Sequence, residues 1–237
     1  MHLKKCVTVI LLLVLVLCNT SCAERAVPAV EETDVMYMTH MSESHQISVQ
    51  IPQSESDTVH ALVQNFITER LRSDCEFTEV LTLSATDIES DIQGDYSGCF
   101  ADIDCEIVGK TEERISILFS GIFNRKTAAH PNRCFFTLNI DPVTGRRLMF
   151  KDMYAVNEEL YECFLSYAES ADEQRMSNAD VSELCSKERF LQGLEDEKEY
   201  STYFTQTGVG FGYPVAHAVG DYQTVEIPYE ELNMFRL

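Results

Sequence analysis

The chain is poor in basic residues and has no tryptophan. It carries 18 lysines and arginines against 39 aspartates and glutamates, a formal net charge of −21 over 237 residues. Proteins that bind nucleic acid neutralise phosphates with Lys and Arg, and proteins that bind anionic lipid by charge need the same side chains. The acidic balance therefore argues against a nucleic-acid partner and against a purely electrostatic attachment to a membrane.

Several motifs that accompany catalysis are also missing. The sequence has no G-x-S-x-G or S-x-x-K motif for a serine nucleophile and no CxxC pair for zinc. The segment Gly208–Gly212 lies between two apparent strands, so it predicts a glycine-rich hairpin with room for bulky neighbours and not a dinucleotide fingerprint. Asp102, Asp104 and Glu106 alternate along one strand beside like charges, which is typical of a solvated face. We expect no catalytic residue, no cofactor and no metal site.

The N-terminal apolar run of the chain is too short for a comfortable membrane span. Lys4 and Lys5 precede the run Cys6–Cys18, which has the length of a signal-peptide core. Small residues then precede Cys22, so residues 1–21 are predicted to be a lipoprotein-type signal peptide with Cys22 as the lipid attachment site. Cleavage by ordinary signal peptidase after Ala23, or an uncleaved anchor, are the alternatives. Each places the rest of the chain outside the cytoplasm.

Cys6, Cys18 and Cys22 belong to the signal or the lipid site, so six of the nine cysteines remain in the body of the chain. An even number in an exported chain is compatible with up to three disulfides, and Cys163 with Cys185 is a candidate pair across two predicted helices. Removal of residues 1–21 takes away Lys4 and Lys5 and no acid, so the net charge moves from −21 to −23.

The remaining chain predicts one α+β domain. Residues 22–45 are polar and predict a flexible tether, and residues 46–237 are predicted to form the domain. Hydrophobic residues make up 45% of the chain, enough for a globular core. Apolar periodicity predicts a strand at 47–51, an amphipathic helix across 54–74, an antiparallel meander over 96–150, helices at 157–170 and about 179–193, and further strands at 203–205, 209–213 and 224–227.

Two stretches resemble a known extracytoplasmic family. The first runs from Ile115 to Tyr154 and the second from Gly208 to Leu232. Together they resemble the domain of unknown function shared by the anti-sigma factor RsiV and the peptidoglycan deacetylase PdaC. The motifs, in chain order, are Ala129-His130-Pro131-Asn132, Asn139-Ile140-Asp141, Thr144-Gly145, Phe150-Lys151-Asp152-Met153 and Val225-Glu226-Ile227-Pro228-Tyr229-Glu230-Glu231-Leu232.

The resemblance implies a binding role, because RsiV-like proteins bind lysozyme directly. Only five residues precede the apolar run and no deacetylase domain follows Leu237, so the expectation is the extracytoplasmic domain alone. We expect a non-enzymatic, membrane-tethered binding module of the bacterial envelope, whose partner is a cationic protein such as lysozyme or an envelope polymer. The alternatives are a structural lipoprotein and an envelope enzyme acting on glycan or peptide, which would need His130 or His217 in a pocket near a carboxylate or free thiol.

Overall fold

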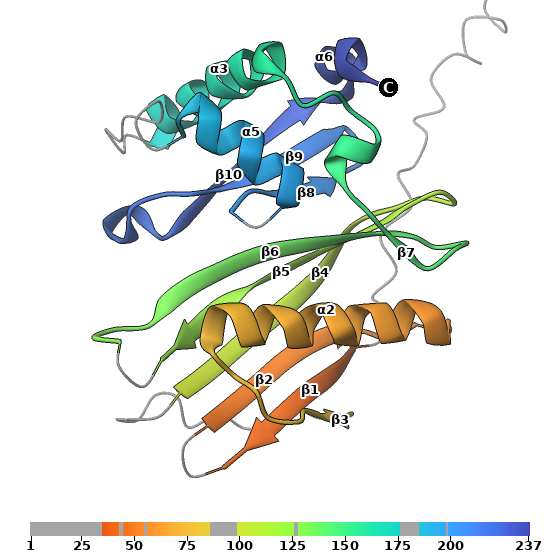
Figure 1. The fold of residues 1–237 in the computed structure, drawn as a ribbon, viewed down its shortest axis with the longest axis vertical. Helices are drawn as coiled ribbons and strands as arrows, with labels where there is room; N and C mark the ends of the chain where they lie inside the picture. The colour runs from red at the N-terminus through yellow and green to blue at the C-terminus, as the bar shows by residue number, and fades with distance from the viewer. Residues whose placement is uncertain are drawn as a thin grey trace, which may run out of the picture. The chain divides into compact units, whose positions relative to one another are not determined.

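The computed structural model describes residues 35–42, 45–54, 56–85, 99–125, 128–175, 185–197 and 199–237, which belong to one compact unit. The fold is α+β, as predicted (Figure 1). Its elements are β1 (Val35–Met41), β2 (His45–Pro52), α2 (Asp57–Cys75), β3 (Thr82–Ser84), β4 (Cys99–Lys110), β5 (Ile115–Asn124), β6 (Asn132–Asp141), β7 (Arg146–Leu148), η1 (Phe150–Asp152), α3 (Glu158–Arg175), α5 (Lys187–Asp196), β8 (Ser201–Phe204), β9 (Gly208–Pro214), η2 (His217–Val219), β10 (Tyr222–Pro228), α6 (Tyr229–Leu232) and η3 (Asn233–Phe235).

The larger sheet has seven strands in the order β3-β1-β2-β4-β5-β6-β7. The β4-β5-β6-β7 part is the predicted antiparallel meander. Three features were not predicted: β2 pairs with β4 in parallel, β3 pairs with β1 at the edge of the sheet, and residues 35–41, assigned to the tether, form β1. Met38 on β1 is buried and pairs with Val49 of β2, so this part of the expected tether belongs to the folded domain.

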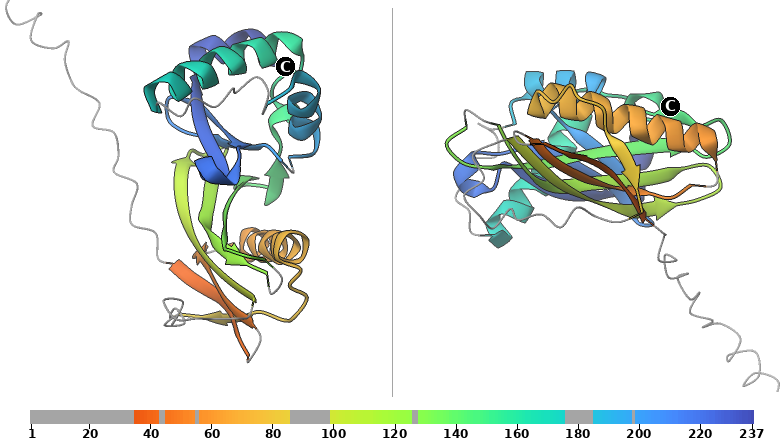
Figure 2. Two further views of the ribbon diagram at one scale, coloured as in Figure 1. Left: turned by 90° about the vertical axis from the view of Figure 1, so that its left-hand side faces the viewer. Right: turned by 90° about the horizontal axis from the view of Figure 1, so that it is seen from below.

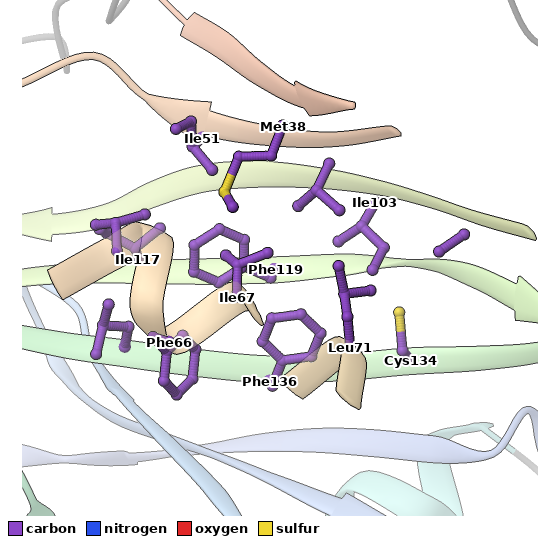
Figure 3. Close-up of a cluster of buried hydrophobic side chains, with 14 of the residues drawn as sticks. Met38, Ile51, Phe66, Ile67, Leu71, Ile103, Ile117, Phe119, Cys134 and Phe136 are labelled. Carbon is purple, nitrogen blue, oxygen red and sulfur yellow. The ribbon is translucent and has the colours of Figure 1, made fainter. Parts of the chain in front are cut away.

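Helix α2 covers one face of this sheet. Ser56 caps it, because its hydroxyl accepts a hydrogen bond from the Val59 amide. The apolar face of α2 packs against the inward residues of β5 and β6, among them Phe119 and Phe136, whose rings stack 5.2 Å apart (Figure 3). The helix predicted from periodicity is therefore confirmed.

The smaller sheet has the order β10-β9-β8 and a core of its own. Helices α3 and α5 pack on it (Figures 1 and 2), and Phe164 and Phe190 from these helices lie against Phe211 of β9. None of the helices in the described ranges has the length and apolarity needed to cross a membrane.

Buried hydrogen bonds join the two sheets. The Ser116 hydroxyl donates to Asn139 Oδ1 at 2.6 Å and accepts from the Phe204 amide at 3.0 Å. The Asn139 amide and the Thr137 hydroxyl both donate to the carbonyl of Thr202, at 2.8 and 2.7 Å. Because polar groups removed from water need partners, this network ties β5 and β6 to β8.

Candidate functional site

An open hollow of about 300 Å³ lies where the two sheets and α2 meet. Its walls come from the last turns of α2, the adjoining ends of β5 and β6, and the small sheet. It is lined by three arginines, several aromatic rings and three acids. Its lining residues include Arg70, Asp74, Arg125, Arg133, Cys134, Phe135, Glu199, Gly212, Asp221 and Tyr222.

Two of the arginines are held by the end of α2. Arg70 pairs with Asp74, one turn later, at 2.9 Å. The Arg125 guanidinium donates hydrogen bonds to the backbone carbonyl of Asp74, and the distance from Nε to that oxygen is 2.7 Å. The same guanidinium lies 3.6 Å from the carboxylate of the exposed Glu76. Glu76 ends the helix in the left-handed conformation, φ 58°. The carbonyls at the helix end are thus partners for a cation.

The third arginine is positioned through its backbone. The Arg133 amide donates to Asp221 Oδ2 at 2.8 Å, and the other oxygen of Asp221 lies 2.7 Å from Nδ1 of His217. The His217 ring stacks on His130, with ring centres 4.0 Å apart. The Arg133 side chain itself is exposed, and it forms no ion pair with another described residue.

Aromatic rings form the wall on the side of the small sheet. Phe135 of β6 stacks on Tyr222 of β10 with ring centres 4.7 Å apart and meets Tyr203 edge-on. A side chain on Gly212 would place its Cβ 2.1 Å from the Phe135 ring, and one on Gly210 would lie 2.0 Å from the Tyr203 ring. The bulky neighbours predicted for Gly208–Gly212 are therefore present, but the segment lies within strand β9 and is not itself the turn of a hairpin.

The free thiol at the hollow is poorly suited to nucleophilic chemistry. Cys134 is buried, and burial, reinforced by Asp74, raises the pKa of its thiol to about 12. The thiolate is the nucleophilic form of cysteine. Neither His130 nor His217 lines the hollow. The pair His217 and Asp221 is hydrogen-bonded, but the His217 side chain is about half exposed. The described residues hold no cluster of three or more metal-binding side chains.

The predicted disulfide is not formed in the structure, where Cys163 and Cys185 are free thiols. Cys185 precedes α5, which begins only at Lys187, so it does not lie on the helix that periodicity had predicted. It is fully buried and its neighbours include Tyr200 and Arg189, whereas Cys163 lies near Glu231. The two thiols thus have different neighbours. Cys22 lies outside the described residues.

The motifs behind the family resemblance have mainly structural roles. Asp141 caps the β6–β7 turn by accepting from the Val143 and Thr144 amides, and Gly145 adopts φ 66° there. Phe150 is fully buried, and the Asp152 carboxylate accepts from the Met149 amide. These residues fix the fold and line no part of the hollow. Of the three acids predicted to form a solvated face on β4, Asp104 and Glu106 are exposed and Asp102 is half-buried.

Sequence reasoning did not find the hollow. Arg70 lies on α2, Arg125 directly follows β5 and Arg133 lies on β6, and no spacing motif links them. The sequence offered only a weak signal for the hollow: basic residues are scarce, and three of the 18 come together there.

The fold is similar to that of solved structures, among them two DUF3298 family proteins. A DUF3298 family protein of Pseudomonas aeruginosa PAO1 aligns over 86% of this chain and 94% of its own length, with a TM-score of 0.55 and 13% sequence identity. A DUF3298 family member of Bacteroides fragilis aligns over 87% and 93%, with a TM-score of 0.52 and 13% identity. No protein-family model and no curated protein matches the sequence. At this identity the similarity concerns the fold: the chain is similar in architecture to DUF3298 proteins.

Proposed function

We propose that this protein is a non-enzymatic binding module of the bacterial envelope, related to the RsiV/PdaC-type domain and held at the membrane surface by a lipid on Cys22. The observation that carries the proposal is the hollow between α2 and the two sheets, where guanidinium groups and stacked aromatic rings come together. Such groups recognise ligands through directed hydrogen bonds and flat contact surfaces.

The chemistry of the hollow favours binding over catalysis. A nucleophilic cysteine needs a lowered pKa and a base within hydrogen-bond reach. Cys134 has a raised pKa, and no histidine lines the hollow. Each acid of the hollow is paired with a basic side chain: Asp74 with Arg70, Glu199 with Arg189 at 2.5 Å, and Asp221 with His217. These carboxylates hold the walls of the site.

The net charge favours a cationic protein over an envelope polymer as the partner. At −21, the field of the whole chain attracts cations and repels anionic polymers over distances of a Debye length, about 8 Å at physiological salt. A cationic protein such as lysozyme is therefore the preferred partner, and an envelope polymer is the second. Charge steering of this kind acts on the association rate and weakens as salt rises.

The test is co-sedimentation or pull-down with lysozyme, and separately with insoluble cell-wall polymer, at low and high salt. The full chain is compared with Arg133→Ala and with a matched control, Arg146→Ala, an exposed arginine of β7 that does not line the hollow. We expect capture that weakens with salt, is reduced by Arg133→Ala and is unchanged by Arg146→Ala. Capture of neither partner at low salt would overturn both partner classes. Equal capture by the two variants would show that binding occurs elsewhere.

A further inference from the structure

One edge of β6 is left unpaired beside the hollow. On one side β6 pairs with β5 from Asn132 to Ile140. On the other side, its ladder with β7 covers only Asn139 to Asp141. Within the described part of the chain, no strand pairs with β6 on that side between Asn132 and Leu138. An unpaired strand edge is a template for the backbone of another chain.

The Arg133 amide shows which groups point outward. It faces the open side, where it donates to Asp221. Amide and carbonyl groups alternate between the two sides along a strand, so those of Phe135 and Thr137 face the same side. Thr137 is buried where its side chain bonds to Thr202. The usable edge is therefore the short stretch around Phe135, and it opens into the hollow.

The hollow supplies a charged group and an apolar wall beside this edge. Arg133 is exposed and has no ion-pair partner among the described residues, while each acid of the hollow has a basic or N–H partner. Arg133 and Tyr222 both line the hollow, where the Tyr222 ring stacks on Phe135. The charged group without an ion-pair partner at this edge of β6 is therefore the Arg133 guanidinium, and the stacked rings of Phe135 and Tyr222 line the same hollow.

We propose that the hollow binds the carboxyl-terminal end of an extended peptide, whose backbone pairs with β6 at Phe135, whose terminal carboxylate bonds to Arg133 and whose last side chain packs on Phe135 and Tyr222. This inference rests on the proposed function and names the ligand class of the same site. A volume of about 300 Å³ is at the lower limit for ligand pockets, so it suits the last residues of a chain and not a long segment. The acidic field favours a peptide that is basic upstream of its end.

The absence of tryptophan from the chain provides a clean assay. The probe is acetyl-Ala-Lys-Ala-Trp with a free carboxylate, whose own fluorescence anisotropy reports binding to the full-length protein. The matched ligands are its carboxyl-terminal amide, an analogue with N-methyl groups on the central amides, and acetyl-tryptophan. The matched proteins are Arg133→Ala and Arg146→Ala.

We expect the free carboxylate to bind best and the amide to bind about tenfold or more weakly, the effect of losing one charge-assisted hydrogen bond. Arg133→Ala should remove this preference, and Arg146→Ala should keep it. The N-methyl analogue and acetyl-tryptophan should both bind more weakly than the probe. Equal affinity of carboxylate and amide would overturn the role of Arg133, and equal affinity of the N-methyl analogue would overturn pairing with β6.

The proposed function can survive failure of this inference. If no peptide binds, yet Arg133→Ala still loses capture of lysozyme or cell-wall polymer, the hollow is a binding site for another ligand class. If the peptide binds but neither envelope partner is captured, the peptide site stands and the proposed partners are wrong.

Discussion

Arg147 of β7 and Glu197, which follows α5, form a mostly buried ion pair. Arg147 Nη2 lies 2.8 Å from Glu197 Oε2, and the Glu197 side chain is only 3% exposed. The other carboxylate oxygen accepts from the Phe150 amide at 2.9 Å and the Thr202 hydroxyl at 3.1 Å. The Arg147 guanidinium also lies over the ring of Phe66 on α2. This pair connects the side of the large sheet covered by α2 to the segment between α5 and β8.

Glu197→Ala should destabilise the protein by about 3–5 kcal/mol, because it leaves a partly buried guanidinium and two donors without their acceptor. Glu197→Gln should cost less, since the amide oxygen can still accept a hydrogen bond. Urea unfolding followed by circular dichroism measures both changes.

The matched control is Glu195→Ala. Glu195 pairs with Lys151 at 3.1 Å, but its side chain is 56% exposed, so the loss should be about 0–1 kcal/mol. A similar free energy of unfolding for the Glu195 and Glu197 variants would contradict the role given to the buried pair.

Two glycines should differ in their tolerance of alanine. A Cβ at Gly109 would lie 2.0 Å from the carbonyl oxygen of Phe204, whereas at Gly212 it would meet the Phe135 ring. The Phe204 backbone is fixed by its bond to Ser116, while an aromatic ring can rotate or shift. We expect both variants to lose roughly 1–3 kcal/mol, with Gly109→Ala the worse. Thermal unfolding monitored by circular dichroism ranks them, and the opposite order would show that β8 moves more readily than Phe135.

Sequence periodicity was sufficient to place elements that have a clear apolar face. It placed α2, whose apolar face packs in the same core as Phe136 and Leu138 of the meander. It did not show that the opposite face of β5 and β6 is buried too, because Ser116, Thr137 and Asn139 are polar. Their burial depends on hydrogen bonds to β8, more than 60 residues away from each of them. An alternating pattern cannot distinguish such a face from one in water.

The site was beyond sequence reasoning for a related reason. Arg70, Arg125 and Arg133 look like ordinary surface cations in the sequence, and the unpaired edge of β6 follows from the shortness of β7. By contrast, the motif positions Asp141, Gly145 and Phe150 are conspicuous in the sequence because local turn geometry and core packing demand particular residues.

Alkylation can test directly whether Cys163 and Cys185, in the core of the smaller sheet, are free thiols. Cys163 and Cys185 are separate in the structure, so denaturation without reductant should leave both open to alkylation. Peptide mapping by mass spectrometry should find each in its alkylated form. A peptide linking the two residues by a disulfide would restore the pairing first predicted from the sequence and contradict the structure.

Cys134 should make stability fall at alkaline pH. Burial raises the pKa of its thiol from 9.0 to about 12. A group whose pKa is raised on folding stabilises the folded state fully below its unfolded pKa, and this contribution is lost as pH rises from about 9 toward 12. Between pH 8 and pH 10 this thiol should therefore remove about 1.4 kcal/mol of stability.

Cys105 behaves in the same way, because burial, aided by Asp104, raises the pKa of its thiol to about 12. Urea unfolding in the presence of reductant, at pH 8 and at pH 10, compares the natural chain with Cys134→Ala and Cys105→Ala. Each alanine variant should lose less stability than the natural chain over this interval, whatever its stability at pH 8. The comparison is thus independent of any packing defect that the substitution creates. Parallel losses in all three proteins would mean that these thiols ionise as readily in the folded protein as in the unfolded chain.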